Sequence, residues 1–363
     1  MNVCVVATAS RESGALSVFK QFITALKTEQ GDDRYCIFVD PSMPHEEIEG
    51  VTYIDYDTCG ARRLAFDAFG FRNEVERAGF SPDVIVSFQN VAVAYPKARQ
   101  IIYFHNLLPL TNIMWNPFLR DERTLFFYST VYPYYIRMYL KKNMQVVVQT
   151  QSVKDMFVAK FRFPRENVHV CRPDIVLPDK DTDISCDFEK GTFNFIYPAL
   201  LYKYKNHNLL IEAANIIKSR NPEVWRKLRI HLTIAPEESH ALIRRIHRNQ
   251  CSDTFILHGS IVHTQLMAMF AGCSGLLFPS RLETLGIPLL EAASAGLPII
   301  VSDLPYAREA VGGYEGAVFV DCADAELWAN EIVKMCNNKQ KNKLYKIEGK
   351  SSWSKFFGLI HNK

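Results

Sequence analysis

Short apolar segments and longer amphipathic segments alternate along this chain in two successive runs. The apolar segments are rich in Val and Ile and lie between turn residues, which is typical of parallel strands buried on both faces. The amphipathic segments carry apolar residues at helical spacing, as residues 15–27 do. Alternating strands and helices predict an α/β fold with doubly wound parallel sheets, and two runs predict two such domains.

The two runs are separated by residues 173–191, which are acidic and lack apolar periodicity, so we interpret them as a linker. The predicted domains are therefore 1–175 and 190–340. In the first run, strands are predicted at 3–7, 35–39, 83–87, 101–104 and 145–148, and helices at 15–27 and 62–78. In the second run, strands are predicted at 193–197, 229–234, 254–257, 275–278, 298–301 and 317–320, and helices at 206–218, 239–248, 264–271, 287–295 and 325–337. Such sheets bind ligands at the carboxyl ends of their strands, so two facing domains predict a cleft between them.

Composition narrows the class of protein further. The 363 residues are 48% hydrophobic and 22% charged, which excludes a disordered chain, collagen and a disulfide-stapled miniprotein. No apolar stretch reaches the roughly 20 residues of a membrane-spanning helix, and we expect the apolar N-terminal run to be a strand rather than a signal peptide. The nine Cys include no C-x-x-C pair, which favours free thiols in a reducing cytoplasm over disulfides or a zinc site.

The segment 97–165 combines positive charge with aromatic residues. It holds eleven Lys or Arg residues against three acidic ones, and its aromatic residues are concentrated between Trp115 and Tyr139. One interpretation is a solvated basic face beside an aromatic helix that packs on the sheet. The alternative is peripheral contact with an anionic membrane, with rings at the depth of the headgroups and cations on phosphates. Nucleic acid suits the charge as well, but it is the least favoured partner and we expect none.

The most informative segment is 278–303, where a buried strand is followed by a short loop and a helix. Pro288 suits the first turn of that helix, because its missing N–H would be unpaired there. Glu283 lies on the loop and Glu291 near the helix start, so both carboxylates can face one opening, toward which we expect the backbone N–H groups of residues 284–286 to point. A helix start attracts anions. Together with carboxylates that bind hydroxyls, it favours a ligand that has both phosphates and hydroxyls, such as a sugar nucleotide.

Seven residues separate Glu283 from Glu291, which is the E-x7-E spacing of retaining glycosyltransferases. The surrounding sequence resembles glycosyltransferase family 4 at Pro279-Ser280, Gly286-Ile287-Pro288, Glu291-Ala292 and Gly296-Leu297-Pro298. This resemblance implies the GT-B fold, in which two doubly wound Rossmann-like domains face each other across a cleft. It is dense over about 190–360 and sparse before. It also implies that a C-terminal helix at about 345–363 packs back on the N-terminal, acceptor-side domain, and that 190–340 binds the nucleotide sugar.

A second match follows the strand predicted at 193–197. Lys205 stands where the family has a Lys that contacts the donor diphosphate, which suits a point charge on a flexible stem. Ala199 stands where many members have Arg, so a second cation is missing. Lys203 is one replacement, although we favour a solvated surface role for it.

Three further positions match the family one by one. Gly14 stands where relatives place a glycine loop near the donor phosphates, and His105 follows the strand at 101–104, where relatives often carry a His beside the donor sugar. His258 lies in a segment that resembles the border of the nucleobase site, with a structural histidine as the alternative. The resemblance thus implies that Glu283, His105 and Lys205 are catalytic, and that the donor is bound by Gly14, Lys205, His258, Glu283, Thr284, Leu285, Gly286 and Glu291.

The implied reaction is transfer of a hexose from a UDP- or GDP-sugar to a glycan or lipid-linked acceptor. The setting would be O-antigen, capsule or lipopolysaccharide assembly, in the cytoplasm at the inner face of the cell membrane. No cofactor and no metal are expected, since the family does not normally use one. Two alternatives remain open: a sugar-nucleotide epimerase of similar fold, and a non-catalytic module that binds sugar or phospholipid. The basic aromatic segment favours a transferase with a lipid-linked acceptor over the epimerase.

Overall fold

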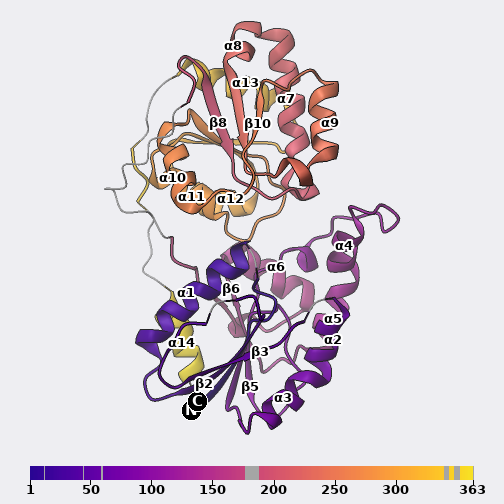
Figure 1. Ribbon diagram of the computed structural model, residues 1–363, viewed down its shortest axis with the longest axis vertical. Helices are drawn as coiled ribbons and strands as arrows, with labels where there is room; N and C mark the ends of the chain where they lie inside the picture. The colour runs from indigo at the N-terminus through magenta and orange to yellow at the C-terminus, as the bar shows by residue number, and fades with distance from the viewer. Residues whose placement is uncertain are drawn as a thin grey trace. The chain divides into compact units, whose positions relative to one another are not determined.

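The computed structural model describes residues 1–11, 13–43, 45–58, 60–175, 188–338, 343–346 and 352–362. The chain forms two compact units, one of Met1–Asp174 with Gly349–Lys363 and one of Ile175–Glu348 (Figure 1). Residues 176–187 of the predicted linker lie outside the described residues, as do Cys59 and Cys186. The cysteines that the structure describes are free thiols. None of the described helices is long and apolar enough to cross a membrane.

The first unit is built on a seven-stranded sheet in the order β3-β2-β1-β4-β5-β6-β7, in which every neighbouring pair is parallel. The strands are β1 (Asn2–Val6), β2 (Arg34–Val39), β3 (Val51–Asp55), β4 (Val84–Ser87), β5 (Arg99–Tyr103), β6 (Gln145–Val148) and β7 (Val168–Val170). The strand order reverses between β1 and β4, so the carboxyl ends of these strands form the switch point at which such sheets bind ligands. The predicted doubly wound α/β sheet is confirmed here.

The helices of the first unit are α1 (Ser13–Glu29), α2 (Ala61–Ala65), η1 (Phe66–Gly70), α3 (Phe71–Arg77), η2 (Leu108–Leu110), α4 (Arg123–Phe126), η3 (Phe127–Val131), α5 (Tyr132–Tyr139), α6 (Gln151–Phe161), η4 (Arg165–Asn167) and α14 (Trp353–His361). The helix predicted at 62–78 is present as the continuous run of α2, η1 and α3, and the unpredicted feature is the π-helical turn η1 within it. Phe66 and Phe71 both pack against Phe38, with ring centroids 5.7 and 5.4 Å away. A π turn pairs residues five apart, and so brings both rings to one face.

The last helix, α14, belongs to the core of the first unit. The rings of Phe357 and Phe22 stack with centroids 5.4 Å apart, which joins α14 to α1. Arg99, at the start of β5, donates hydrogen bonds to the carbonyl groups of Leu359 and Ile360. These carbonyls lie at the C-terminal end of the helix, where a cation is favourable.

The second unit is built on a six-stranded sheet in the order β10-β9-β8-β11-β12-β13, again entirely parallel. The strands are β8 (Phe193–Tyr197), β9 (Leu228–Leu232), β10 (Phe255–Leu257), β11 (Gly275–Phe278), β12 (Ile299–Ser302) and β13 (Ala317–Val320). The helices are η5 (Lys203–Lys205), α7 (His207–Arg220), α8 (Pro222–Lys227), η6 (Pro236–Glu238), α9 (His240–Arg248), α10 (His263–Gly272), α11 (Ile287–Ser294), α12 (Pro305–Val311) and α13 (Ala325–Asn337). The strand order reverses between β8 and β11, which therefore mark the switch point of this sheet.

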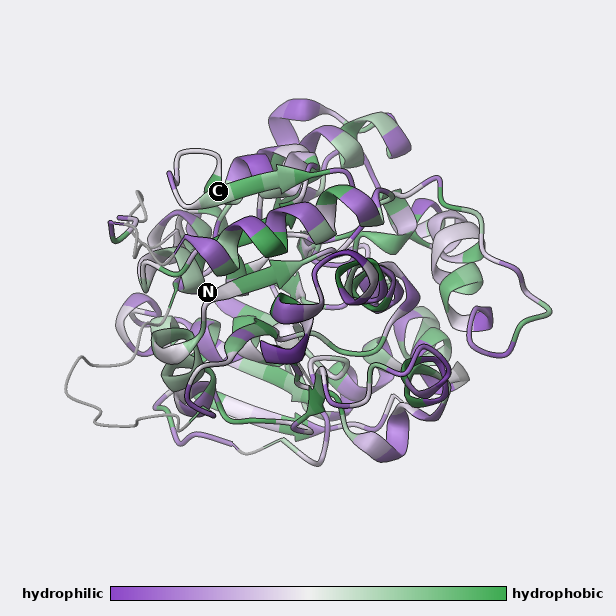
Figure 2. Cartoon of the chain, turned by 90° about the horizontal axis from the view of Figure 1, so that it is seen from above, coloured by the Kyte–Doolittle hydropathy of each residue, from purple (hydrophilic) through white to green (hydrophobic). Residues whose placement is uncertain are grey.

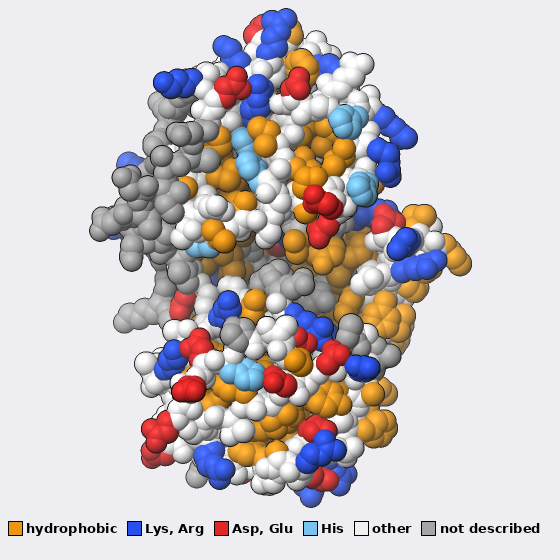
Figure 3. Space-filling view, viewed as in Figure 1, with side chains coloured by type: hydrophobic (Ala, Val, Ile, Leu, Met, Phe, Trp, Pro, Cys, Tyr) orange, Lys and Arg blue, Asp and Glu red, His pale blue; other side chains and the backbone are white. Residues whose placement is uncertain are grey.

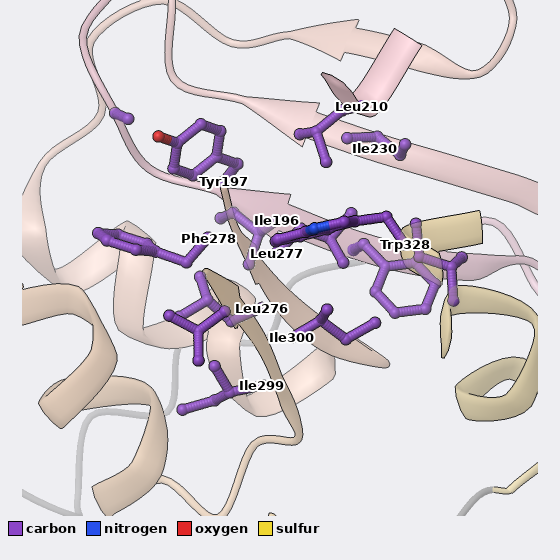
Figure 4. Close-up of a cluster of buried hydrophobic side chains, with 14 of the residues drawn as sticks. Ile196, Tyr197, Leu210, Ile230, Leu276, Leu277, Phe278, Ile299, Ile300 and Trp328 are labelled. Atoms are coloured by element: carbon purple, nitrogen blue, oxygen red, sulfur yellow. The ribbon is translucent and has the colours of Figure 1, made fainter. Parts of the chain in front are cut away.

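Apolar strand residues and helix faces close the core of the second unit. Figure 4 shows Ile196, Leu276 and Ile300 from three neighbouring strands, with the indole of Trp328 among the same buried side chains. The indole N–H of Trp328 donates to the carbonyl of Asp321 at 2.9 Å, so the buried ring keeps its hydrogen bond. The strands are largely hydrophobic, and the helices carry hydrophilic and hydrophobic stripes (Figure 2).

Candidate donor-binding site

Two loops meet at the switch point of the second unit. One follows β8 and ends in Lys205, and the other follows β11 and carries Glu283. Because β8 and β11 are parallel neighbours, both loops leave the same edge of the sheet. The backbone N–H of Arg281 donates to the carbonyl of Tyr204 at 2.8 Å, which ties the loops together. The hydroxyl of Tyr197, the last residue of β8, donates to the carbonyl of Lys205 at 2.7 Å and fixes the first loop to its own strand.

Lys205 and Glu283 form an ion pair in this place. The ammonium Nζ of Lys205 lies 2.5 Å from Oε1 of Glu283, and the side chains are only 16% and 13% exposed. The ammonium also lies over the ring of Tyr204, whose centroid is 5.6 Å from Nζ. Burial and the Glu283 charge raise the pKa of Tyr204, so its hydroxyl stays protonated. The structure thus brings together two predicted site residues that are far apart in the sequence.

The start of α11 supplies backbone donors next to Glu283. Gly286 precedes the helix in the left-handed conformation, with φ of 70°, and no side chain caps the first turn. A Cβ at Gly286 would lie 2.9 Å from Cδ1 of Leu289, so glycine is favoured both by backbone conformation and by space. Leu285 is buried in the core, and only its backbone is available to a ligand. Thr284 lies on the same loop and is half-buried.

Glu291 is buried and has a side-chain partner of its own, and the expectation that it faces the same opening as Glu283 stays a prediction. It is only 5% exposed, and Oε1 lies 2.7 Å from Nε2 of His263, at the start of α10. Burial raises the pKa of Glu291, and the contact with His263 opposes that rise. Sequence reasoning missed His263, because nothing in the spacing of the two residues indicates that β10–α10 and α11 meet there.

His258 takes part in a chain of polar contacts. Its Nε2 lies 2.8 Å from Nδ1 of His231, and Nε2 of His231 lies 3.0 Å from the amide oxygen of Asn194. Burial lowers the pKa of both imidazoles, that of His231 to about 4. These contacts are what a structural role of His258 requires, and its contact with a nucleobase stays a prediction.

Gly14 and His105 belong to the first unit. Gly14 lies in the first turn of α1, and a Cβ there would meet no atom within 4 Å. His105 follows β5, and its backbone N–H donates to the side-chain oxygen of Asn90 at 2.7 Å. Burial and the nearby Arg63 guanidinium lower the pKa of His105 to about 4, so its imidazole is neutral at pH 7. Gly14 follows β1 and His105 follows β5, so both residues come after the carboxyl ends of strands in the first sheet. Their roles toward a donor stay predictions.

Arg281 is a further residue that sequence reasoning missed. It is exposed, its backbone is held by Tyr204, and within the described part of the chain its guanidinium has no hydrogen-bond or ion-pair partner. Ala199, where many family members have Arg, is buried and contributes no charge. The signal that could have found Arg281 is its position two residues before Glu283.

The part of the chain that carries this site is similar to a known family. Residues 183–352 match the family model of the glycosyl transferases group 1. This part of the chain belongs to the group 1 glycosyltransferases. The E-x7-E and Lys205 segments that carry the resemblance to family 4 all fall within the matched residues. The predicted family is thereby confirmed.

Individual relatives are distant. Over 209 residues the chain is 22% identical to the O-antigen chain mannosyltransferase RfbU of Salmonella typhimurium, a match that spans 57% of this chain and 55% of that protein. The chain thus spans about half of the length of this relative. Among solved structures, sucrose-phosphate synthase of Thermosynechococcus elongatus superimposes with a TM-score of 0.68 at 13% identity, over 99% of this chain and 92% of that one. Anabaena HepE in complex with UDP and glucose gives 0.65 at 15% identity, over 99% and 94%. These likenesses confirm the GT-B fold.

Proposed function

We propose that this protein is a retaining glycosyltransferase that moves a hexose from a nucleoside diphosphate sugar to a hydroxyl of a glycan or lipid-linked acceptor. The observation that carries the proposal is the Lys205–Glu283 ion pair beside the uncapped start of α11. A sugar nucleotide offers a diphosphate to the cation and the helix start, and hydroxyls to the carboxylate. The group 1 family and the UDP bound by HepE support this choice of donor.

In the proposed reaction the bond between the anomeric carbon and the diphosphate breaks, and negative charge grows on the leaving group. Lys205 and the N–H groups of residues 284–286 stabilise that charge. Glu283 holds hydroxyls of the sugar and fixes the ring, which is catalysis by positioning. Glu291 binds ribose hydroxyls. The acceptor hydroxyl attacks from the face that the diphosphate leaves, and its proton passes to the departing phosphate.

The residues outside this loop pair have secondary roles in the proposal. The second unit binds the donor, with His258 at the nucleobase. The first unit binds the acceptor, with Gly14 near the diphosphate and His105 beside the donor sugar. Because His105 is neutral at pH 7, its imidazole can accept or donate a hydrogen bond there without adding charge.

The charge balance of the loop pair calls for a second cation. The Glu283 carboxylate neutralises Lys205 in the structure, whereas a diphosphate brings further negative charge. Arg281 lies on the loop of Glu283, and its guanidinium is free within the described residues. We therefore assign to Arg281, rather than to Lys203, the role of the Arg that Ala199 replaces. A planar guanidinium suits phosphate oxygens.

The proposed setting is assembly of a cell-envelope glycan such as O-antigen, capsule or lipopolysaccharide, at the inner face of the cell membrane. The name of the Salmonella relative, an O-antigen chain mannosyltransferase, supports it. Peripheral contact with an anionic membrane is part of the proposal, because segment 97–165 is basic and aromatic.

The test is incubation of the purified protein with UDP- and GDP-hexoses, with and without a glycan acceptor, followed by detection of transfer or slow hydrolysis. Thermal unfolding with UDP, GDP and uridine identifies the base, because ligand binding raises the melting temperature by mass action. Release of a free epimerised sugar that carries deuterium from heavy water would show an epimerase instead. Absence of any nucleotide binding would leave a non-catalytic module.

A further inference from the structure

The exposed hydrophobic side chains of the first unit are concentrated in one part of it. Among its described residues, the large hydrophobic side chains that are exposed are Leu64, Phe69, Met114, Phe118, Leu119, Val131, Tyr134 and Met138. Met114 is 93% exposed and Phe118 is 86% exposed. Single exposed apolar residues are normal on a protein surface, whereas a group of them marks a contact site.

The outer face of η3 and α5 carries an apolar stripe. Val131, Tyr134 and Met138 are three and four residues apart, which places them on one side of a helix. Tyr132, Pro133 and Ile136 are buried on the opposite side. The helix is thus apolar on both sides, whereas a helix at the surface of a globular protein normally turns its polar side outward. Exposed apolar stripes flanked by cations are typical of helices that lie in a membrane interface.

A cavity of about 300 Å³ adjoins this stripe. Met114, Tyr134 and Phe161 contribute apolar walls, and its lining has two cations, Arg137 and Lys160, and no acidic residue. The contacts that hold these cations are long: Nζ of Lys160 lies 3.5 Å from the carbonyl of Thr111, and Nη2 of Arg137 lies 3.4 Å from the carbonyl of Lys160. Both cations therefore keep most of their capacity for an anion.

Hydroxyl groups also line the cavity. Ser129 and Thr130 line it with hydroxyls that can bind phosphate oxygens. Figure 3 shows hydrophobic and basic side chains next to one another on the projection beside α4. The surface thus offers cations and hydroxyls for a phosphate, directly beside exposed apolar side chains.

We propose that this surface, which comprises the cavity and the stripe of Val131, Tyr134 and Met138, is a docking site for the phosphate headgroup of an anionic membrane lipid. The phosphate lies between Arg137 and Lys160, and Met114 and the stripe lie among the upper acyl chains. A soluble phosphate would leave the apolar side chains unused. Nucleic acid could stack on Tyr134, but it would leave Met114, Val131 and Met138 exposed without an apolar partner.

This inference deepens the membrane contact of the proposed function and rests on that part of it, but not on the donor site. The test is flotation of the full chain with vesicles of phosphatidylcholine alone or mixed with phosphatidylglycerol, at low and high salt. We expect binding to the anionic vesicles at low salt and partial release at high salt. No binding to anionic vesicles at low salt would overturn the proposal, and so would equal binding to both kinds of vesicle.

Two double variants test the cations and the apolar side chains of the surface separately. Arg137→Ala with Lys160→Ala should lower the vesicle partition coefficient at least tenfold, from about fivefold for each cation. Met114→Ser with Tyr134→Ser should lower it by a similar factor. The matched controls in the second unit are Arg226→Ala with Lys227→Ala on α8 and Leu327→Ser on α13, all at exposed positions. Control variants that lose as much binding would contradict the assignment of the surface.

Two further measurements distinguish the lipid site from a site for other ligands and from the proposed donor site. Complete displacement from vesicles by millimolar glycerol phosphate, with no binding left through the apolar side chains, would show a site for free phosphate. Binding of single-stranded RNA that competes with vesicles would show a nucleic acid surface. Either result would overturn the proposal. The melting-temperature shift with UDP is measured on every variant. A wild-type protein that floats but binds no nucleotide would refute the donor proposal alone, and one that binds UDP but does not float would refute the lipid site alone.

Discussion

The ammonium of Lys205 and the carboxylate of Glu283 lie 2.5 Å apart, although 78 residues separate them in the chain. Their loops leave neighbouring parallel strands at the point where the strand order reverses. The pair is largely shielded from water, so each charge depends on the other. In the free protein the two groups that are proposed to grip different parts of a donor therefore hold each other in place.

Removal of either partner should affect both stability and activity. Lys205→Ala leaves the Glu283 carboxylate poorly solvated and should lower the free energy of unfolding by about 2 kcal/mol. The double variant with Glu283→Gln should recover much of that loss, whereas transferase activity should fall about 100-fold or more in every variant. Urea unfolding and initial rates measure the two quantities. Full activity in both single variants would refute the site.

Arg281→Ala should weaken binding of a nucleoside diphosphate about tenfold, because one charged hydrogen bond to phosphate is lost. Binding of the parent nucleoside should not change. The comparison variant is Lys203→Ala, at the position that the sequence offered as the alternative cation, and it should leave both affinities unchanged. Titration calorimetry with UDP and uridine measures them. The opposite outcome, in which only Lys203→Ala loses affinity, would transfer the role to Lys203.

Gly286→Ala should destabilise the second unit and displace the start of α11. The residue has φ of 70°, and a Cβ would lie 2.9 Å from Leu289. The strain should cost about 1–2 kcal/mol. Gly259→Ala is the matched control, since Gly259 has φ of 74° but nothing within 4 Å of a Cβ. It should cost less and leave UDP binding intact. Equal losses in thermal stability and UDP affinity would show that the contact with Leu289 is unimportant.

Acid should destabilise the protein through its buried histidines. Burial lowers the pKa of His231 to about 4 and, with the Lys205 charge, that of His207 to about 3. In the unfolded chain both titrate near 6.5. The folded state therefore binds fewer protons below pH 6.5, so stability is complete above that pH and declines as the pH falls toward 4 and 3. At pH 5 the loss should be about 2 kcal/mol for His231 alone.

Urea unfolding between pH 5 and 8 measures this effect. His231→Asn should flatten the pH profile, because Asn cannot take up a proton. His240→Asn, an exposed position on α9, is the control and should leave the slope unchanged. A wild-type profile with no slope between pH 6.5 and 5 would contradict the assignment of neutral buried imidazoles.

Sequence patterns predicted those parts of the fold that are set by local burial. The strands at 145–148, 193–197, 275–278 and 317–320 have the predicted bounds, since continuous apolar runs reveal strands covered on both faces. β3 and β7 were missed. β3 is an edge strand with partly exposed residues, and β7 has only three residues. The π-helical turn η1 was missed because its cause, two rings packing on Phe38, is a tertiary contact.

Part of the candidate site could likewise be predicted from the sequence, and part could not. The motif spacing indicated Glu283 and Lys205, and the structure shows them in contact. The partners of Glu291 and His258 could not be predicted, because His263 and His231 approach them only through the sheet topology. Arg281 has no motif of its own, and only the hydrogen bond to Tyr204 reveals its proximity to the Lys205 loop.

The position of α14 has a consequence for synthesis of the chain. Phe22 of α1 needs Phe357 to complete its packing, and more than 300 residues are translated between the two. During synthesis on the ribosome, the apolar side chains of α1 that α14 covers therefore stay exposed until the second unit has been translated. A chaperone that shields Phe22 and its neighbours during that interval would raise the yield of native protein.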